Sequence, residues 1–109
     1  MRMDRVPFAA IDWAEIPVEE RAGEKGTARS RTFMSDAYRV RMVEYSPGYL
    51  ADHWCSKGHI VLCVLGEFLS EHKDGSLHTI RQGMSYMVGD NDVPHRSSTE
   101  RGATLFIVD

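Results

Sequence analysis

Short runs of strand-forming residues, separated by Gly, Pro and Asp-Gly turns, recur along the chain from Thr27 to its last residues. Runs of this length at regular spacing, with almost no helical periodicity, are typical of an all-β sandwich or barrel. Closure into a barrel or jelly roll would cover the strand edges that such a set otherwise exposes. We therefore expect an all-β fold, a small jelly-roll barrel, with strands near residues 38–45, 49–55, 60–65, 68–72, 77–81, 84–88, 95–98 and 103–108.

Two glycines, Gly66 and Gly75, separate the strand-like runs in the middle of this pattern. Residues 60–65 form a continuous apolar run with β-branched side chains, which favours a buried strand, and Gly66 is expected to end it. The pair Asp74-Gly75 between two strand-like runs predicts a β-hairpin. His72 and His78 flank this turn, and we expect them to form a surface pair.

The first 26 residues lack the strand pattern. A short helical turn is expected at residues 12–15, and Pro17 ends it. The charged stretch 18–25 is interpreted as a surface arm. The chain is therefore divided into an N-terminal arm, residues 1–26, packed on the outside of a barrel formed by residues 27–109.

Composition restricts the classes of partner. A chain of 109 residues with net charge −3 and no basic block is expected to form one domain and not to bind nucleic acid. No apolar run is long enough for a membrane span, and the N-terminal residues lack the apolar stretch of a signal peptide. We therefore expect no membrane partner and a cytoplasmic location. Two cysteines are too few for a disulfide framework.

His53, Cys55 and His59 form the densest group of metal-ligating residue types in the sequence. On a strand, His53 and Cys55 share one face, whereas Asp52 and Trp54 point to the other. His59 would open the next strand, about 5 Å away, so the three donors can meet at a metal whose bonds are about 2.0 to 2.3 Å long. Cys63 lies about 13 Å further along that strand and is expected in the core.

The spacing also resembles a known family. Pro47-Gly48, His53-x-Cys55, His59 and Gly66 are similar to the first cupin motif, and the segment from Gly83 to His95 is similar to the second. Cys55 stands where that motif has its second His, and His59 stands where it has Glu. The string Asp52-His53-Trp54-Cys55 also resembles a small group of single-domain cupins named for an Asp-His-Cys-Trp (DHCW) motif.

The cupin resemblance implies a jelly-roll barrel and a metal site with four ligands: His53, Cys55, His59 and His95. Small cupins often form pairs, and twofold pairing is the commonest assembly, so we expect a homodimer. A thiolate ligand favours zinc among divalent ions, with iron, nickel and copper as alternatives. The resemblance to the DHCW group implies the fold and the site but no particular reaction.

Two functions follow from such a site. In the first, the protein is a metalloenzyme that acts on a small organic substrate by oxygenation, isomerisation or hydrolysis. Tyr86, Arg39 and Arg41 are the candidates for lining its substrate pocket, with core packing as the alternative for Tyr86 and solvent exposure for the arginines. In the second, the protein is a non-catalytic metal or small-ligand binding module, because four protein ligands would close the site. In an emptied site the same residues would only hydrogen-bond.

Overall fold

A computed structural model describes residues 3–109 of the chain, and nearly all regular secondary structure in these residues is β-strand. One short 3-10 helix, η1, precedes eight strands. The bounds are η1 Trp13–Glu15, β1 Glu19–Ala22, β2 Thr27–Met34, β3 Arg39–Tyr45, β4 His59–His72, β5 Leu77–Arg81, β6 Ser85–Val88, β7 His95–Ser98 and β8 Ala103–Val108. The predicted all-β class is confirmed. Within residues 3–109, no helix is long and apolar enough to cross a membrane.

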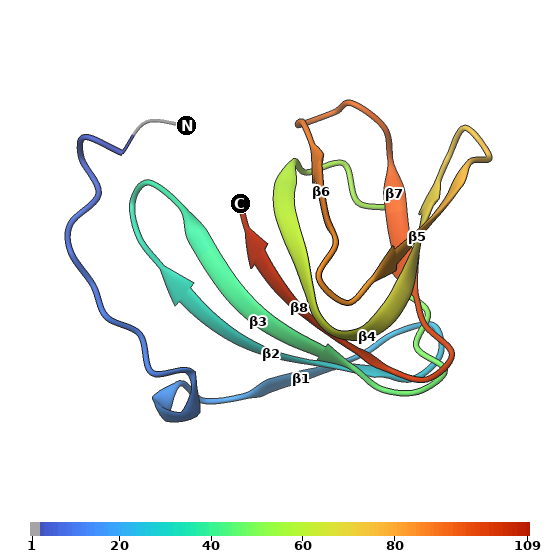
Figure 1. Ribbon diagram of the computed structural model, residues 1–109, viewed down its shortest axis with the longest axis horizontal. Helices are drawn as coiled ribbons and strands as arrows, with labels where there is room; N and C mark the ends of the chain where they lie inside the picture. The colour runs from blue at the N-terminus through green and yellow to red at the C-terminus, as the bar shows by residue number, and fades with distance from the viewer. Residues whose placement is uncertain (1–2) are drawn as a thin grey trace.

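All strand pairs are antiparallel, and the hydrogen-bonded order is β1-β2-β3-β8-β4-β5, with β6 and β7 also paired to β4. The expected closure into a barrel is wrong, because this order is an open path from β1 to β5. The strands instead form two facing layers that share β4 (Figure 1). One, the curved layer, contains β1, β2, β3, β8, β6 and the first half of β4, and the other contains β5, β7 and the second half of β4.

β4 is one bent strand where the sequence predicted two. Its first half pairs with β6 and β8, and its second half pairs with β5 and β7. Gly66 lies at the bend with φ +74°, and a Cβ there would lie 2.4 Å from the carbonyl oxygen of Gly102. The register also shifts between Cys63 and Leu65, which marks a β-bulge. Gly66 therefore bends the strand between the two layers and does not end it.

The core lies between these layers and is built from alternate residues of the long strands. In β8, Ala103, Leu105 and Ile107 are buried and the residues between them are not. Phe68 and Cys63 of β4 pack in the same cluster. Cys63 is fully buried, as expected for a core cysteine.

The segment before β4 is not the strand that we expected at residues 49–55. It pairs with its neighbours only through isolated bridges, at Leu50 with Lys25 and Ser98, and at Cys55 with His95. Because the backbone is not extended throughout, strict alternation of side chains does not hold there. This matters for His53, which lies between the two bridged positions.

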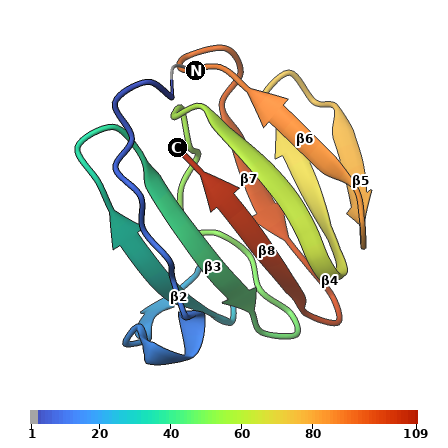
Figure 2. The ribbon, with the colours of Figure 1, turned by 60° about the vertical axis from the view of Figure 1, so that its left-hand side comes forward.

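From residue 3 onward, the segment before η1 follows the outside of the curved layer, beside β2 (Figure 2). The predicted helical turn is confirmed as η1, whose N-terminus is capped by Asp12. Trp13 of η1 packs edge-on against Phe106 of β8, with ring centroids 6.3 Å apart. The charged stretch contains a strand that was not predicted, β1, which pairs with β2 at the edge of the sheet. All four β1 residues are exposed, and the charges of Glu19, Glu20 and Arg21 disfavour pairing of that edge with another chain.

Candidate metal centre

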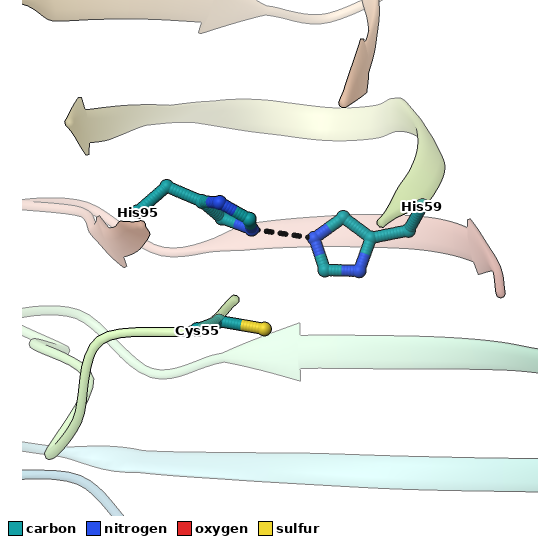
Figure 3. Close-up of side chains that lie close together, drawn as sticks. All are labelled: Cys55, His59 and His95. Atoms are coloured by element: carbon teal, nitrogen blue, oxygen red, sulfur yellow. Dashed lines mark hydrogen bonds between the residues drawn. The ribbon is translucent and has the colours of Figure 1, made fainter. Parts of the chain in front are cut away.

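Three of the four predicted ligands converge where the start of β4 faces the start of β7. Cys55 comes from the segment before β4, His59 is the first residue of β4, and His95 is the first residue of β7. One donor atom from each lies within 4.8 Å of the others. The closest approach joins the two histidine Nε2 atoms, which are 2.8 Å apart (Figure 3). The arrangement is that of ligands directed at a common point.

Cys55 is placed next to His95 by backbone pairing. The Cys55 N–H donates to the carbonyl oxygen of His95 at 2.7 Å, and the His95 N–H donates to that of Cys55 at 3.0 Å. The neighbouring Trp54 lies against the guanidinium of Arg96, 4.6 Å from its ring centroid. Arg96 in turn donates from Nε to Glu71 at 2.7 Å. The loop that contains Cys55 is thus attached to β7 and β4 through the contact of Trp54 with Arg96.

The other ring nitrogen of each histidine faces an acceptor. Nδ1 of His95 lies 2.9 Å from the carbonyl oxygen of Val93, and Nδ1 of His59 lies 3.4 Å from a carboxylate oxygen of Asp109. A carbonyl or an ionised carboxylate can only accept, so each Nδ1 carries the hydrogen in a neutral ring. Each Nε2 is then left with a lone pair.

The charge state of His59 points the same way. Burial lowers the pKa of His59 below its usual value, and the nearby His95 adds to this, although the Asp109 carboxylate opposes it. His59 therefore favours the neutral form. In the tautomer with hydrogen on both Nδ1 atoms, the two Nε2 lone pairs face each other at 2.8 Å and can bind a common ion. Without an ion, the same contact is a hydrogen bond in which one Nε2 carries the hydrogen. This donor set, with the Cys55 sulfur beside it, fits a zinc-type ion.

His53, the fourth predicted ligand, lies apart from this group. Its side chain is 66% exposed, against 9% for that of His59, and its Nδ1 lies 2.7 Å from Asp52. The structure does not bring its ring to the point where the other three meet. Asp52, expected on the opposite face from His53, contacts it because this segment is not a strand.

Arg39 and Arg41 line the pocket beside the three candidate ligands, and both bind the carboxylate of Asp109. Arg39 donates to both Asp109 oxygens at 2.8 and 2.9 Å, and Arg41 donates to one at 3.2 Å. Burial raises the pKa of Asp109, but the hydrogen bond from Arg39 and the charge of Arg41 outweigh it and hold that pKa at about 2. Asp109 is therefore ionised at neutral pH.

The pocket next to the ligands has a volume of about 580 Å³ and is open to solvent. Cys55, His59, His95 and Tyr86 all contribute to its wall. The Tyr86 ring lies 6.1 Å from the His59 ring and 6.3 Å from the His95 ring, between centroids. Burial raises the pKa of Tyr86 well above its usual value, so its phenol stays protonated and can donate a hydrogen bond.

No protein-family model and no curated protein sequence matches the chain. Solved structures do match in fold. A predicted oxalate decarboxylase from Thermotoga maritima superposes with a TM-score of 0.77 at 17% identity, over 92% of this chain and 96% of that one. A sugar phosphate isomerase of the cupin superfamily, from Silicibacter pomeroyi, gives 0.70 at 18% identity, over 92% and 74%. The iron(II) form of HppE gives 0.74 at 15% identity, over 98% and 62%. The chain has a cupin fold.

Sequence reasoning missed one residue of this candidate site, Asp109. A usable signal was present, because Leu105 and Ile107 are alternate apolar residues of a strand and Asp109 continues the same face. A carboxylate at the end of an inward-facing row is a poor core residue unless cations meet it. Arg39 and Arg41, two residues apart on β3, are those cations.

Proposed function

We propose that this protein is a metal-dependent cupin in which Cys55, His59 and His95 bind a divalent ion and a small organic substrate occupies the adjoining pocket. The observation that supports it is the facing pair of Nε2 atoms, 2.8 Å apart, each with an acceptor behind the opposite ring nitrogen. The donors that a metal requires are thus already oriented toward one point. The fold neighbours described as a decarboxylase and an isomerase support a small-molecule substrate.

Zinc is the ion that we favour, because Cys55 supplies a soft ligand and the histidines supply borderline ones. Iron, nickel and copper are the alternatives, and the neighbour described as the iron(II) form supports a metal of this kind in the fold. When bound, such an ion polarises a substrate oxygen or lowers the pKa of a bound water. Three protein ligands leave a position for substrate, which favours catalysis over a closed structural site.

The pocket supplies the rest of the chemistry from the chain itself. Tyr86 offers a phenol donor beside the two histidines, and because burial raises its pKa the phenol stays neutral well into alkaline solution. A substrate with an oxygen acceptor would be oriented by this hydrogen bond. Isomerisation and hydrolysis need no redox change at the metal and suit zinc, whereas oxygenation would require iron or copper.

A non-catalytic binding module is the second candidate, and one observation favours it. His53 lies two residues from Cys55, borders the same pocket and is largely exposed, so its side chain is free to turn. A fourth protein ligand from this position would close the site.

Cobalt substitution tests the proposal and separates the two candidates. We expect purified protein to bind one zinc or cobalt ion, with a sulfur-to-cobalt absorption band that is lost in Cys55→Ser and kept in His78→Ala. His78 is a suitable control because it lies on the β4–β5 hairpin, where it contacts Ser76 and the ring of His72 and none of the three candidate ligands. Added azide should shift the spectrum of an open site and leave that of a closed one unchanged. Wild-type protein that binds neither ion would overturn the proposal.

Pairing with a second copy and a cytoplasmic location stay predictions of the sequence. Light scattering of the purified protein measures the first directly. We expect the mass of two chains.

A further inference from the structure

We propose that Asp109 is a positioning residue of the metal centre, fixed by Arg39 and Arg41, which sets the orientation and tautomer of His59. This inference rests on the proposed metal site and adds a function for three residues outside the ligand set. It also gives the two arginines a role other than contacting the substrate in the pocket.

The position of the Asp109 carboxylate is fixed by hydrogen bonds to its side chain and to its backbone. Its side chain is 1% exposed and receives three hydrogen bonds, at 2.8, 2.9 and 3.2 Å, from the two guanidinium groups. Its backbone is paired with Arg39 as well, since the Arg39 N–H donates to the Asp109 carbonyl at 2.6 Å and the Asp109 N–H donates back at 2.8 Å. Both the main chain and the side chain thus fix where the carboxylate points.

That carboxylate faces the ring of His59. The oxygen that Arg41 binds also lies 3.4 Å from Nδ1 of His59, and the opposite ring nitrogen faces His95. An acceptor at this position keeps the hydrogen on Nδ1 and leaves the Nε2 lone pair for a metal. Carboxylates behind ligating histidines act in this way in metalloproteins generally. Without Asp109, Nδ1 could itself accept from water, and the tautomer with hydrogen on Nε2, which cannot bind a metal through Nε2, would become accessible.

The two arginines keep the buried Asp109 carboxylate ionised and in place. A buried carboxylate without cations would take up a proton or move toward solvent, and in either case His59 would lose its acceptor. Arg39 binds both oxygens in the paired geometry that fixes a carboxylate plane. Arg41 adds a donor to the oxygen nearest His59. A chain of hydrogen bonds therefore runs from the two arginines through Asp109 to His59, which faces the candidate metal position.

Two substitutions at this position test the inference. Asp109→Ala removes the acceptor, and Asp109→Asn keeps an acceptor of the same shape but removes the charge. We expect zinc affinity, measured by competition with a chromophoric chelator, to fall about 10- to 100-fold in the alanine variant, the usual effect of losing such a partner. The asparagine variant should lie between it and the wild type. Asp74→Ala, in the exposed β4–β5 turn, is the matched control and should bind zinc as the wild type does.

A structural role alone would not change the tautomer, so NMR supplies the second readout. In the zinc-loaded wild type, we expect a slowly exchanging proton on Nδ1 of His59, and we expect it to exchange rapidly in Asp109→Ala. Unchanged zinc affinity and an unchanged His59 signal in both Asp109 variants would overturn this inference and leave the metal site standing. A wild-type protein that binds no zinc would instead overturn the proposed function. Should Asp109→Ala not fold, the isosteric Asp109→Asn still provides both readouts.

Discussion

Replacing His53 and His95 in parallel measures how many protein ligands the centre has. The sequence predicts four ligands that include His53, whereas the structure brings together Cys55, His59 and His95. We expect His53→Ala to change zinc affinity by less than about threefold. His95→Ala should lower it by about a hundredfold. The contrast between the two variants tests the geometry, because the residue type removed is the same.

The magnitude follows from sharing a known binding free energy among the ligands. Four-ligand structural zinc sites bind with about 10 to 16 kcal/mol, so one ligand accounts for about 3 kcal/mol, which is roughly a hundredfold in affinity. His95 is 3% exposed and its ring is fixed by Val93, so its loss removes a buried donor that already faces Nε2 of His59. His53 is two-thirds exposed, and its hydrogen bond to Asp52 does not direct it at the other donors.

The assay is a competition titration of zinc-free protein against a chromophoric chelator, with circular dichroism to show that each variant is folded. His78→Ala corrects for the loss of an unrelated exposed histidine. A loss of tenfold or more in His53→Ala would show that His53 swings in as a fourth ligand, and the three-ligand reasoning would then fail. Unchanged affinity in His95→Ala would refute the site altogether.

Three further outcomes are expected. Gly66→Ala should lower the midpoint of urea unfolding more than Gly75→Ala, because both glycines have positive φ but only at Gly66 would the Cβ overlap another backbone; equal losses would contradict this. Burial raises the pKa of Tyr49 to about 12, so the unfolded chain releases that proton first, and stability should fall as the pH rises from about 10 to 12. In Tyr49→Phe this alkaline fall should be shallower, as followed by thermal unfolding. Arg96→Ala removes the contact that holds the loop of Trp54 and Cys55, so it should weaken zinc binding several-fold, as measured by calorimetry. Arg96→Lys should be less affected. Wild-type zinc affinity in both variants would refute the role given to that contact.

Local patterns in the sequence were sufficient for the strand content and for the donor types. The alternation in residues 103–108 and the Asp74-Gly75 turn gave β8 and the β4–β5 hairpin, since side-chain period and turn chemistry are properties of neighbouring residues. The placement of Cys63 in the core followed in the same way. His59 and His95 were predicted at one site from motif spacing, although they are 36 residues apart in the sequence.

Tertiary structure decided what those local patterns left open. Whether Gly66 ends a strand or bends it depends on the backbone of Gly102, which lies against it only after folding. Whether His53 joins the site depends on the path of an irregular loop. Side-chain alternation cannot predict this, because it holds only where the backbone is extended. The meeting of Asp109 with two arginines of β3 is a long-range pairing across the sheet. The sequence by itself therefore determined which donors are available, and the packing of β3, β4, β7 and β8 determined which of them meet and what lies behind them.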